Sequence, residues 1–372
     1  MRQVDYFLFN AYNPLIMNKQ FNELSAAELT AKIKVGWNLG NTLDVVYPKL
    51  SGKDVTVWEM ETGWHNPVTT KEMITTIKNA GFNTIRIPVT WCKTIDDDFN
   101  IRKDWMDRVT EVANYAVDNN MIIILNTHHD ESIFKFTDAE TEKSLAVFKK
   151  VWEQIAAAFK DYDENLILEA LNEPRTIKSE FEWKGGTSEE RANLNKHYQV
   201  FVDTVRNSGG NNGRRILMIN TYAASIRQCA IEDLIIPSDT AQNKIIASIH
   251  AYEPNGFALN TKPVGTEGST DKWSVDNPDD IFPITDPVDR AYSAFVSKGI
   301  PVVIGEFGAL NKNNTETRTI WAEYSVRYAK SKGIPCVWWD NGNDNHFLLL
   351  DRRNNTIKYP SIIDALMKGT SD

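Results

Sequence analysis

Short apolar runs alternate with amphipathic stretches along most of the chain, and this alternation constrains the fold more than any other feature. Eight runs rich in Ile, Val and Leu predict strands, at residues 34–39, 82–89, 121–130, 166–171, 215–220, 244–250, 301–305 and 334–339. Apolar residues at helical spacing predict helices between them, at 69–80, 105–119, 140–159, 188–206, 288–298 and 316–331. Eight strands alternating with helices predict the α/β class and a (β/α)8 TIM barrel.

The domain organisation follows from this pattern. A chain of 372 residues suits one such barrel with insertions. We expect residues 1–30 to form a lead-in that packs on a single barrel domain over residues 31–372. The weakest helix prediction lies at 223–234, and the Gly-, Pro- and Asp-rich segment 253–287 is interpreted as an elaborated loop. An open doubly wound sheet is disfavoured because the turn at 36–41, GWNLGN, lacks the GxGxxG spacing of a phosphate-binding turn.

Charge and composition restrict the partners. The net charge of −9 argues against nucleic acid or an anionic membrane surface, and a neutral substrate fits better. No apolar run approaches the roughly 20 residues of a membrane span. The first residues, MRQVDYFLFNAYNPL, do not form a convincing signal peptide because Asp5 and Asn10 interrupt them. Three scattered cysteines indicate neither a disulfide framework nor a metal site.

Polar and aromatic residues gather where the predicted strands end. The stretch LILEALNEP brings Glu173 to one strand end, and PVVIGEFG brings Glu306 to another. The other strand-end residues are Asn38, Asn41, Arg86, His128, His129, Asn172, His250, Tyr252, Trp338 and Trp339. Because the carboxyl ends of parallel barrel strands meet at one rim, we expect these side chains to converge there.

A pair of carboxylates on such a rim fits glycoside hydrolysis, in which one acid protonates the leaving oxygen and a second carboxylate attacks carbon or activates water. A retaining pair lies about 5–5.5 Å apart and an inverting pair lies farther apart. Arg86 could hold Glu306 ionised, form a buried ion pair with Glu169, or do both. Tyr252 could orient Glu306, and Asn172 could bind a sugar hydroxyl. Each could instead brace a loop, and each glutamate could be an ordinary strand-end acid.

A metal site built from His128, His129, Asp130 and His250 is the main catalytic alternative. We disfavour it because adjacent strand residues point to opposite faces and no HxH or HExxH spacing is present. We therefore predict no metal ligands and no cofactor.

The ordered motifs resemble glycoside hydrolase family 5, and within it the subfamily 4 endoglucanases. They run from GWNLGNTLD at 36–44 through GWHNPVTT, IRIPVTW, LNTHHD, EALNEP, WKGGTSEER, HAYEP and GEFG to VWWDNG at 337–342. This resemblance implies a retaining mechanism with Glu173 as acid/base and Glu306 as nucleophile. The shell that it implies around the cleaved sugar comprises Asn38, Arg86, His128, His129, Asn172, His250, Tyr252 and Trp339, with Trp338 as the alternative stacking tryptophan.

The resemblance also implies a substrate and a setting. Trp64 and Trp183 look like loop aromatics that line subsites, and contacts that decide the substrate are expected near Trp58, Trp183 and Trp273. The expected substrate is a plant cell-wall β-1,4-glucan such as cellulose, mixed-linkage glucan or xyloglucan, cleaved internally. An endo-xylanase or mannanase is the alternative, and a non-catalytic polysaccharide-binding barrel is more remote. Family members of this type are expected to be secreted, and we expect a monomer.

Overall fold

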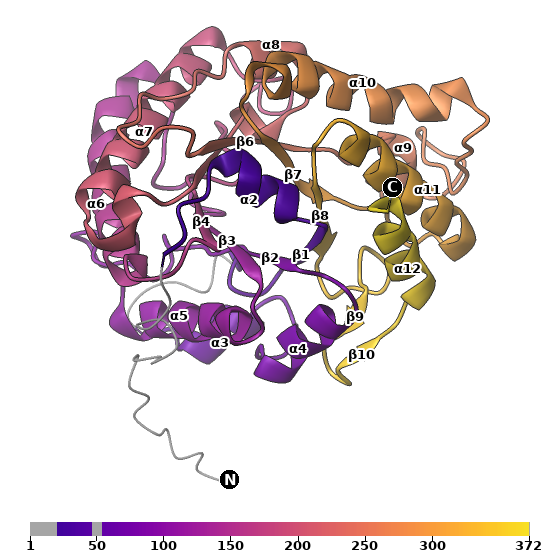
Figure 1. Cartoon of the computed structure of the whole chain (residues 1–372), viewed down its shortest axis with the longest axis horizontal. Helices are drawn as coiled ribbons and strands as arrows, with labels where there is room; N and C mark the ends of the chain where they lie inside the picture. The colour runs from indigo at the N-terminus through magenta and orange to yellow at the C-terminus, as the bar shows by residue number, and fades with distance from the viewer. Residues whose placement is uncertain (1–20, 47–53, 372) are drawn as a thin grey trace, which may run out of the picture.

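A computed structural model describes residues 21–46 and 54–371 of the chain, so residues 1–20 of the predicted lead-in lie outside the described part. Eight parallel strands close into a barrel, in which each strand pairs with its neighbours in chain order and β1 pairs with β8 (Figure 1). The strands are β1 (Val35–Leu39), β2 (Thr84–Ile87), β3 (Ile122–Asn126), β4 (Leu166–Glu169), β5 (Leu217–Asn220), β6 (Ile245–His250), β7 (Val302–Phe307) and β8 (Cys336–Asp340). The predicted (β/α)8 barrel is confirmed.

Helices surround the barrel as an outer ring (Figure 1). They are α3 (Val57–Thr62), α4 (Lys71–Asn79), α5 (Lys103–Asp118), α6 (Asp138–Phe159), α7 (Ser188–Asn207), α8 (Gln228–Glu232), α9 (Asn255–Ala258), α10 (Pro278–Ala294), α11 (Thr315–Ser331) and α12 (Pro360–Gly369). A capping box begins α7, in which Thr187 accepts the Glu190 N–H and Glu190 accepts the Thr187 N–H. Short 3-10 turns lie at Gly210–Gly213, Tyr222–Ala224 and Val296–Lys298, and a small hairpin pairs β9 (Leu350–Asp351) with β10 (Thr356–Ile357).

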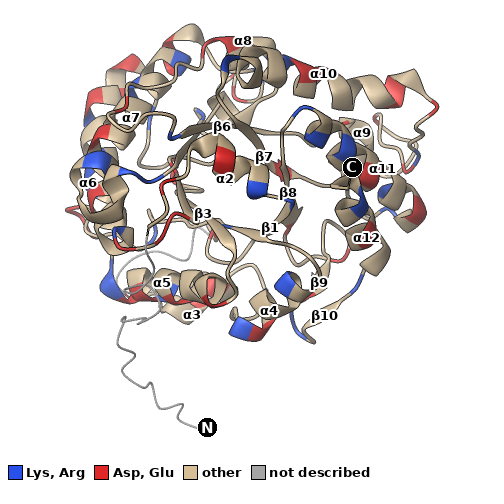
Figure 2. Cartoon of the chain, viewed as in Figure 1, with Lys and Arg blue, Asp and Glu red and all other residues tan. Residues whose placement is uncertain are grey.

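The barrel interior has two layers. Its lower layer is apolar and is closed by α2 (Ala26–Lys32), which crosses the N-terminal end of the strands (Figure 1). Leu29 and Ile33 of this region pack against Ile124, Met218 and Val337 of the barrel strands. Nearer the carboxyl ends, the inward positions are polar. Many Lys, Arg, Asp and Glu residues lie on the outer helices (Figure 2), so the polar residues inside the barrel at this end stand out as a candidate site.

Several element boundaries differ from prediction. The predicted loop after β1 contains the short α3, and the predicted loop 253–287 contains α9 and the first turns of α10. Helix α10 begins ten residues earlier than expected because Asn277 caps it and Pro278 occupies its first turn, where proline is tolerated. The uncertain fifth crossover is only a 3-10 turn followed by the short α8.

Candidate active site

Glu306 reaches the barrel mouth through an irregularity in β7. Ile304 pairs with Ile249, but the next pairing joins Glu306 to His250, so the register shifts at Gly305. Such bulges re-aim side chains, and here the glutamate is brought to the same side as His250. A Cβ on residue 305 would lie 2.9 Å from the Ser248 hydroxyl, so only glycine fits this close approach. This bulge was not anticipated from the sequence.

Two side chains fix the two oxygens of Glu306. The Arg86 guanidinium donates to Glu306 Oε1 at 2.8 Å, and the Tyr252 hydroxyl donates to Oε2 at 2.8 Å. Arg86 also pairs with Glu169, so the two interpretations of this arginine both hold. Burial would lower the pKa of Arg86, but Glu169 and Glu306 raise it overall, so the guanidinium stays charged. The nucleophile predicted from the resemblance is therefore held as an oriented carboxylate.

Glu173 lies in the turn after β4 and faces His250. His250 Nδ1 is 3.0 Å from Glu173 Oε1 and 3.6 Å from Glu306 Oε2, so the imidazole contacts both glutamates. Burial would raise the pKa of Glu173, but the hydrogen bond and charge of His250 and the charge of Arg175 outweigh it, leaving the pKa below its ordinary value. Oxygens of the two glutamates and a nitrogen of His250 all lie within 4.8 Å of one another, a separation that suits a retaining pair.

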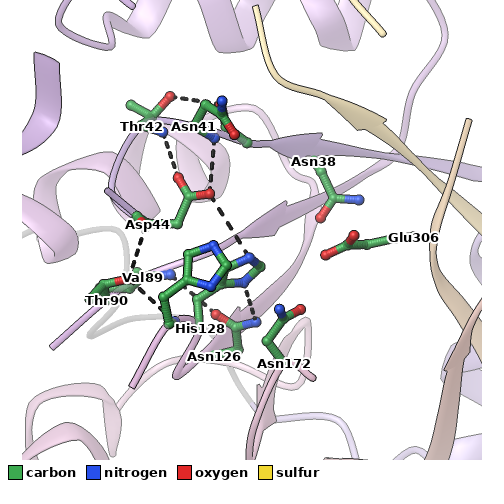
Figure 3. A network of polar contacts seen from close by, with 12 residues as sticks. Asn38, Asn41, Thr42, Asp44, Val89, Thr90, Asn126, His128, Asn172 and Glu306 are labelled. Carbon is green, nitrogen blue, oxygen red and sulfur yellow. Dashed lines mark hydrogen bonds and ion pairs between the residues drawn. The ribbon is translucent and has the colours of Figure 1, made fainter. Parts of the chain in front are cut away.

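His128 lies on the same side of the barrel mouth as Glu306 and is held by Asn126 and Asp44 (Figure 3). The Asn126 amide lies 3.2 Å from its Nδ1, and Asp44 lies 3.9 Å from its Nε2. Asp44 is fixed by the backbone N–H groups of Asn41 and Thr42 at 3.0 and 2.5 Å. The amide donor at Nδ1 favours the tautomer with its proton on Nε2. Burial, together with the charge of neighbouring His129, lowers the pKa of His128 well below its ordinary value, so the ring is neutral.

Aromatic rings form the walls of the site. Trp339 stacks on His128 with centroids 5.7 Å apart and planes 6° apart, and it is 9% exposed. Trp338 is fully buried and donates its indole N–H to the Phe347 carbonyl, so it belongs to the core. Of the two tryptophans left open by the sequence, only Trp339 faces the site. Trp64 contacts His129 edge-on at 5.8 Å, and Trp183 is 54% exposed.

The remaining predicted residues have different positions. Asn172 accepts a 2.7 Å hydrogen bond from Arg86, at the edge of the site. Asn38 is fully buried and links Arg86 to the Gly305 carbonyl, so it supports the site from below rather than facing a ligand. Trp273 is 6% exposed and donates its indole N–H to the Asp280 carbonyl, so its ring packs within the segment after β6, and substrate contacts near it stay a prediction. Trp58 lies on α3 and is 59% exposed.

Sequence reasoning missed the charges that surround Glu173. Arg175 Nη1 donates to Glu131 Oε1 at 2.7 Å and to the Glu173 carbonyl at 2.8 Å, and it lies 3.6 Å from Glu173 Oε2. Neither Arg175 nor Glu131 lies at the end of a predicted strand, and only strand-end residues were expected in the site. The sequence feature that could have identified them is their position directly after predicted site motifs, since Arg175 follows NEP and Glu131 follows HHD.

Two groups of described residues have ligand atoms close enough to hold a cation, namely Asp44 with His128 and His129, and Glu173 with His250 and Glu306. The predicted alternation of adjacent residues, which disfavoured a metal site at His128, His129, Asp130 and His250, does not hold for the two histidines. Both histidines lie beyond the end of β3, so strand alternation does not place them on opposite faces. Their ring centroids are 4.5 Å apart. Both Asp44 oxygens, however, already accept backbone N–H groups, and the glutamates have the partners described above.

A cavity of about 730 Å³ opens beside Glu173. It extends from Glu173 and Trp183 to Arg227, Tyr252, Glu253 and Leu259. Glu306, His128 and Trp339 do not line it. The cavity therefore continues the site on the side of Glu173, away from the wall formed by Trp339.

Comparison with known proteins agrees with this geometry. Residues 49–345 match the sequence model described as cellulase (glycosyl hydrolase family 5), which is more than half of the chain. The chain belongs to glycoside hydrolase family 5. Among its relatives, endoglucanase A of Clostridium longisporum is 45% identical over 93% of this chain, and the cellulase/esterase CelE of Acetivibrio thermocellus is 42% identical over 96%. The chain spans 66% and 42% of the lengths of these two relatives.

Solved family 5 structures share the whole barrel. A subfamily 4 broad-specificity endoglucanase from Ruminococcus champanellensis with bound cellotriose has a TM-score of 0.89 and 42% identity, covering 94% of this chain and 100% of its own. A family 5 lichenase from Caldicellulosiruptor sp. F32 has a TM-score of 0.88 and 42% identity, covering 95% of this chain and 97% of its own. The resemblance to subfamily 4 is confirmed.

Proposed function

We propose that this chain is a retaining endo-β-1,4-glucanase that cleaves internal bonds of plant cell-wall glucans. The observation that carries the proposal is the pair of glutamates within 4.8 Å, with Arg86 and Tyr252 on the two oxygens of Glu306. Relatives named endoglucanases and a solved neighbour with bound cellotriose support a glucan substrate. The catalytic domain is residues 31–372, acting as a secreted monomer.

In the first step, a lone pair of the Glu306 carboxylate forms a bond to the anomeric carbon. The bond from that carbon to the glycosidic oxygen breaks, and the Glu173 proton moves to this oxygen. In the second step, Glu173 takes a proton from water, which attacks the anomeric carbon and releases Glu306. Retention follows because the carbon is inverted twice.

Glu173 must hold a proton for the first step, although its pKa is low in the free site. Its side chain is 18% exposed, and a bound glucan removes this remaining contact with solvent. Desolvation disfavours the carboxylate, so glucan binding raises the pKa of Glu173 toward the value that an acid requires. Arg86 and Tyr252 hydrogen-bond to the two oxygens of Glu306, whereas Glu173 contacts His250, so the two glutamates have different surroundings that suit different roles.

The walls of the site suit a glucan. Trp339 offers an apolar ring beside the polar groups of His128 and Asn172, and sugar rings have apolar faces and hydroxylated edges. Trp64 and Trp183 extend these surfaces. Xylan and mannan remain the alternative substrates, since the groups at the barrel mouth contact features common to these polymers.

A polysaccharide panel tests the proposal. Carboxymethylcellulose, barley glucan, xyloglucan, xylan and mannan would be compared by reducing ends and product sizes, with the anomer of the first product followed by NMR. We expect rapid chain shortening of β-1,4-glucans with retention. Cleavage of mannan or xylan alone would contradict the proposed glucan substrate. A first product of inverted anomeric configuration would contradict the proposed retaining mechanism.

The glutamate roles have a separate test. Glu306→Ala should abolish turnover of every substrate while the protein still folds. Glu173→Ala should lose about 10²–10⁴-fold on polysaccharide and far less on aryl cellobiosides with good leaving groups, which need little protonation. Exposed Glu316 on α11 supplies the control Glu316→Ala, with activity as in the wild type. Equal losses on both substrates would contradict the assignment of Glu173.

A further inference from the structure

Arg175 occupies a central position among the charges next to Glu173. Its side chain is 10% exposed and lies in the turn after β4, two residues beyond the glutamate. Besides Glu131 and the Glu173 carbonyl, it donates from Nε to Glu182 Oε1 at 3.1 Å. A side chain with this many charged partners has one fixed position.

The same guanidinium supports the exposed wall of the cavity. Arg175 Cζ lies 4.5 Å from the centroid of the Trp183 ring. This is the distance of a cation–π contact, and Trp183 is still 54% exposed. Trp183 therefore lies between Arg175 and the cavity of about 730 Å³.

The cavity lies on the leaving-group side. An acid that protonates the glycosidic oxygen stands beside the departing sugar, and Glu173 lines this cavity while the nucleophile Glu306 does not. A sugar that stacks on Trp183 is therefore part of the group that leaves when Glu173 donates its proton.

We propose that Arg175 is a positioning residue that couples the two events: it fixes Trp183 for leaving-group binding and sets the charge beside Glu173 for proton donation. The inference rests on the proposed function. Nothing in the sequence pattern or in the names of the relatives assigns a role to Arg175. Glu131 restrains the arginine, because its 2.7 Å ion pair keeps the guanidinium 3.6 Å from the Glu173 carboxylate instead of in direct contact.

Other charged and titratable groups also face Glu173, from each neighbouring element. They are His250 on β6, Tyr252 after it, Glu306 on β7, and His129 and Glu131 after β3. Replacing Arg175 alone removes none of these groups. The effect of that replacement on the protonation of Glu173 thus has a defined sign.

The variants Arg175→Met and Glu131→Gln should shift the pH profile in opposite directions. Losing the positive charge of Arg175 favours protonated Glu173, so the alkaline limb of kcat/KM should move up by about 0.5–1 pH unit. Losing the charge of Glu131 allows Arg175 to approach Glu173, which favours the Glu173 carboxylate. The alkaline limb should therefore move to lower pH. Arg175→Lys keeps the charge, so the limb should return close to that of the wild type.

A matched control separates this role from support of the loop alone. Arg191 donates to the carbonyls of Gly185 and Gly186, beside Trp183, and is paired with Asp233 rather than with Glu173. Arg191→Met and Trp183→Ala should raise KM for cellopentaose and leave the pH limb unchanged. Arg175→Met should both raise KM for cellopentaose and shift the alkaline limb. Arg175→Lys should restore the position of the limb but not KM.

The measurements are pH profiles of kcat/KM for cellopentaose and for 4-nitrophenyl cellobioside. An unchanged limb in Arg175→Met, or the same shift in Arg191→Met, would overturn the coupling. A wild-type protein that cleaves neither substrate would instead overturn the proposed function, so the two failures are distinguishable.

Discussion

At the scale of single residues, Asp130 is a buried acid whose charge changes with pH in the physiological range. Its Oδ1 accepts the N–H groups of Trp91 and Cys92 at 2.9 and 2.7 Å, and Oδ2 has no partner among the described residues. Burial outweighs these hydrogen bonds and raises the pKa of Asp130 to about 7. An unfolded aspartate ionises near pH 3.9. Between about pH 4 and 7 the folded state therefore holds one more proton, and the stability due to Asp130 falls as pH rises.

Replacing Asp130 by Asn should remove this pH dependence, because the amide oxygen still accepts from Trp91 and Cys92 and cannot ionise. Relative to wild type, the free energy of unfolding of Asp130→Asn should rise by at most about 1.4 kcal/mol per pH unit between pH 4 and 7, and then level off. Urea unfolding at four pH values measures it. Exposed Asp97 supplies the control Asp97→Asn. Parallel curves for wild type and Asp130→Asn would refute the argument.

Residues at strand ends could be predicted because barrel geometry alone brings them together. Glu173, Glu306, Arg86 and His250 form one contact network as expected. Residues that act through another side chain could not be found this way. Asp44 reaches His128 only after the chain folds back beyond β1, and this three-dimensional contact has no fixed spacing in sequence.

At the scale of elements, Lys312 anchors the long segment after β6, together with Asn314, which donates to the Asp271 carbonyl at 2.9 Å. Lys312, beyond β7, donates to the Gly256 carbonyl at 2.7 Å and to the Ser269 hydroxyl and Thr270 carbonyl at 3.0 Å each. A Cβ at residue 256 would lie 2.3 Å from the Gly268 carbonyl oxygen, so the segment folds back tightly on α9. Because Asn255 and Leu259 line the cavity of about 730 Å³ beside Glu173, Lys312 also stabilises part of its wall.

Lys312→Met should loosen this segment, because three acceptors lose a charged donor. We expect a loss of about 2–4 kcal/mol in the free energy of unfolding and faster proteolysis between Leu259 and Trp273. Urea unfolding and digestion mapped by mass spectrometry would measure both. Lys298→Met, at an exposed lysine, is the control. Unchanged cleavage within the segment would show that Lys312 does not hold it.

The strands were predicted better than the segments between them, for a physical reason. A strand covered on both faces needs a continuous apolar run, so burial itself marks it in the sequence. The first turns of α10 contain Pro283, Pro287 and several aspartates, which read locally as a loop. These turns are helical because Ile284 and Val288 pack against the barrel. Such tertiary packing cannot be recognised from the local amino-acid composition.

At the scale of the whole molecule, Arg86 links distant parts of the barrel through its interior. Its five N–H donors reach Asn38 of β1, Glu169 of β4, Asn172 after β4, and Glu306 of β7. Many of the other charged residues lie on the outer helices (Figure 2). The residue that orients Glu306, the proposed nucleophile, therefore also balances buried negative charge in the barrel.

Arg86→Met should combine a stability defect with loss of activity, and a second substitution should separate them. Removing the arginine leaves Glu169 and Glu306 buried without a counter-ion, at a cost of about 3–5 kcal/mol. Adding Glu169→Gln removes one uncompensated charge while keeping an acceptor for Asn220, which donates to Glu169 at 2.9 Å. Urea unfolding should therefore show the double variant to be more stable than Arg86→Met. Hydrolysis of barley glucan should remain absent in both, because Glu306 Oε1 has lost its partner. A double variant no more stable than the single one, or one that regains turnover, would contradict this shared role of Arg86.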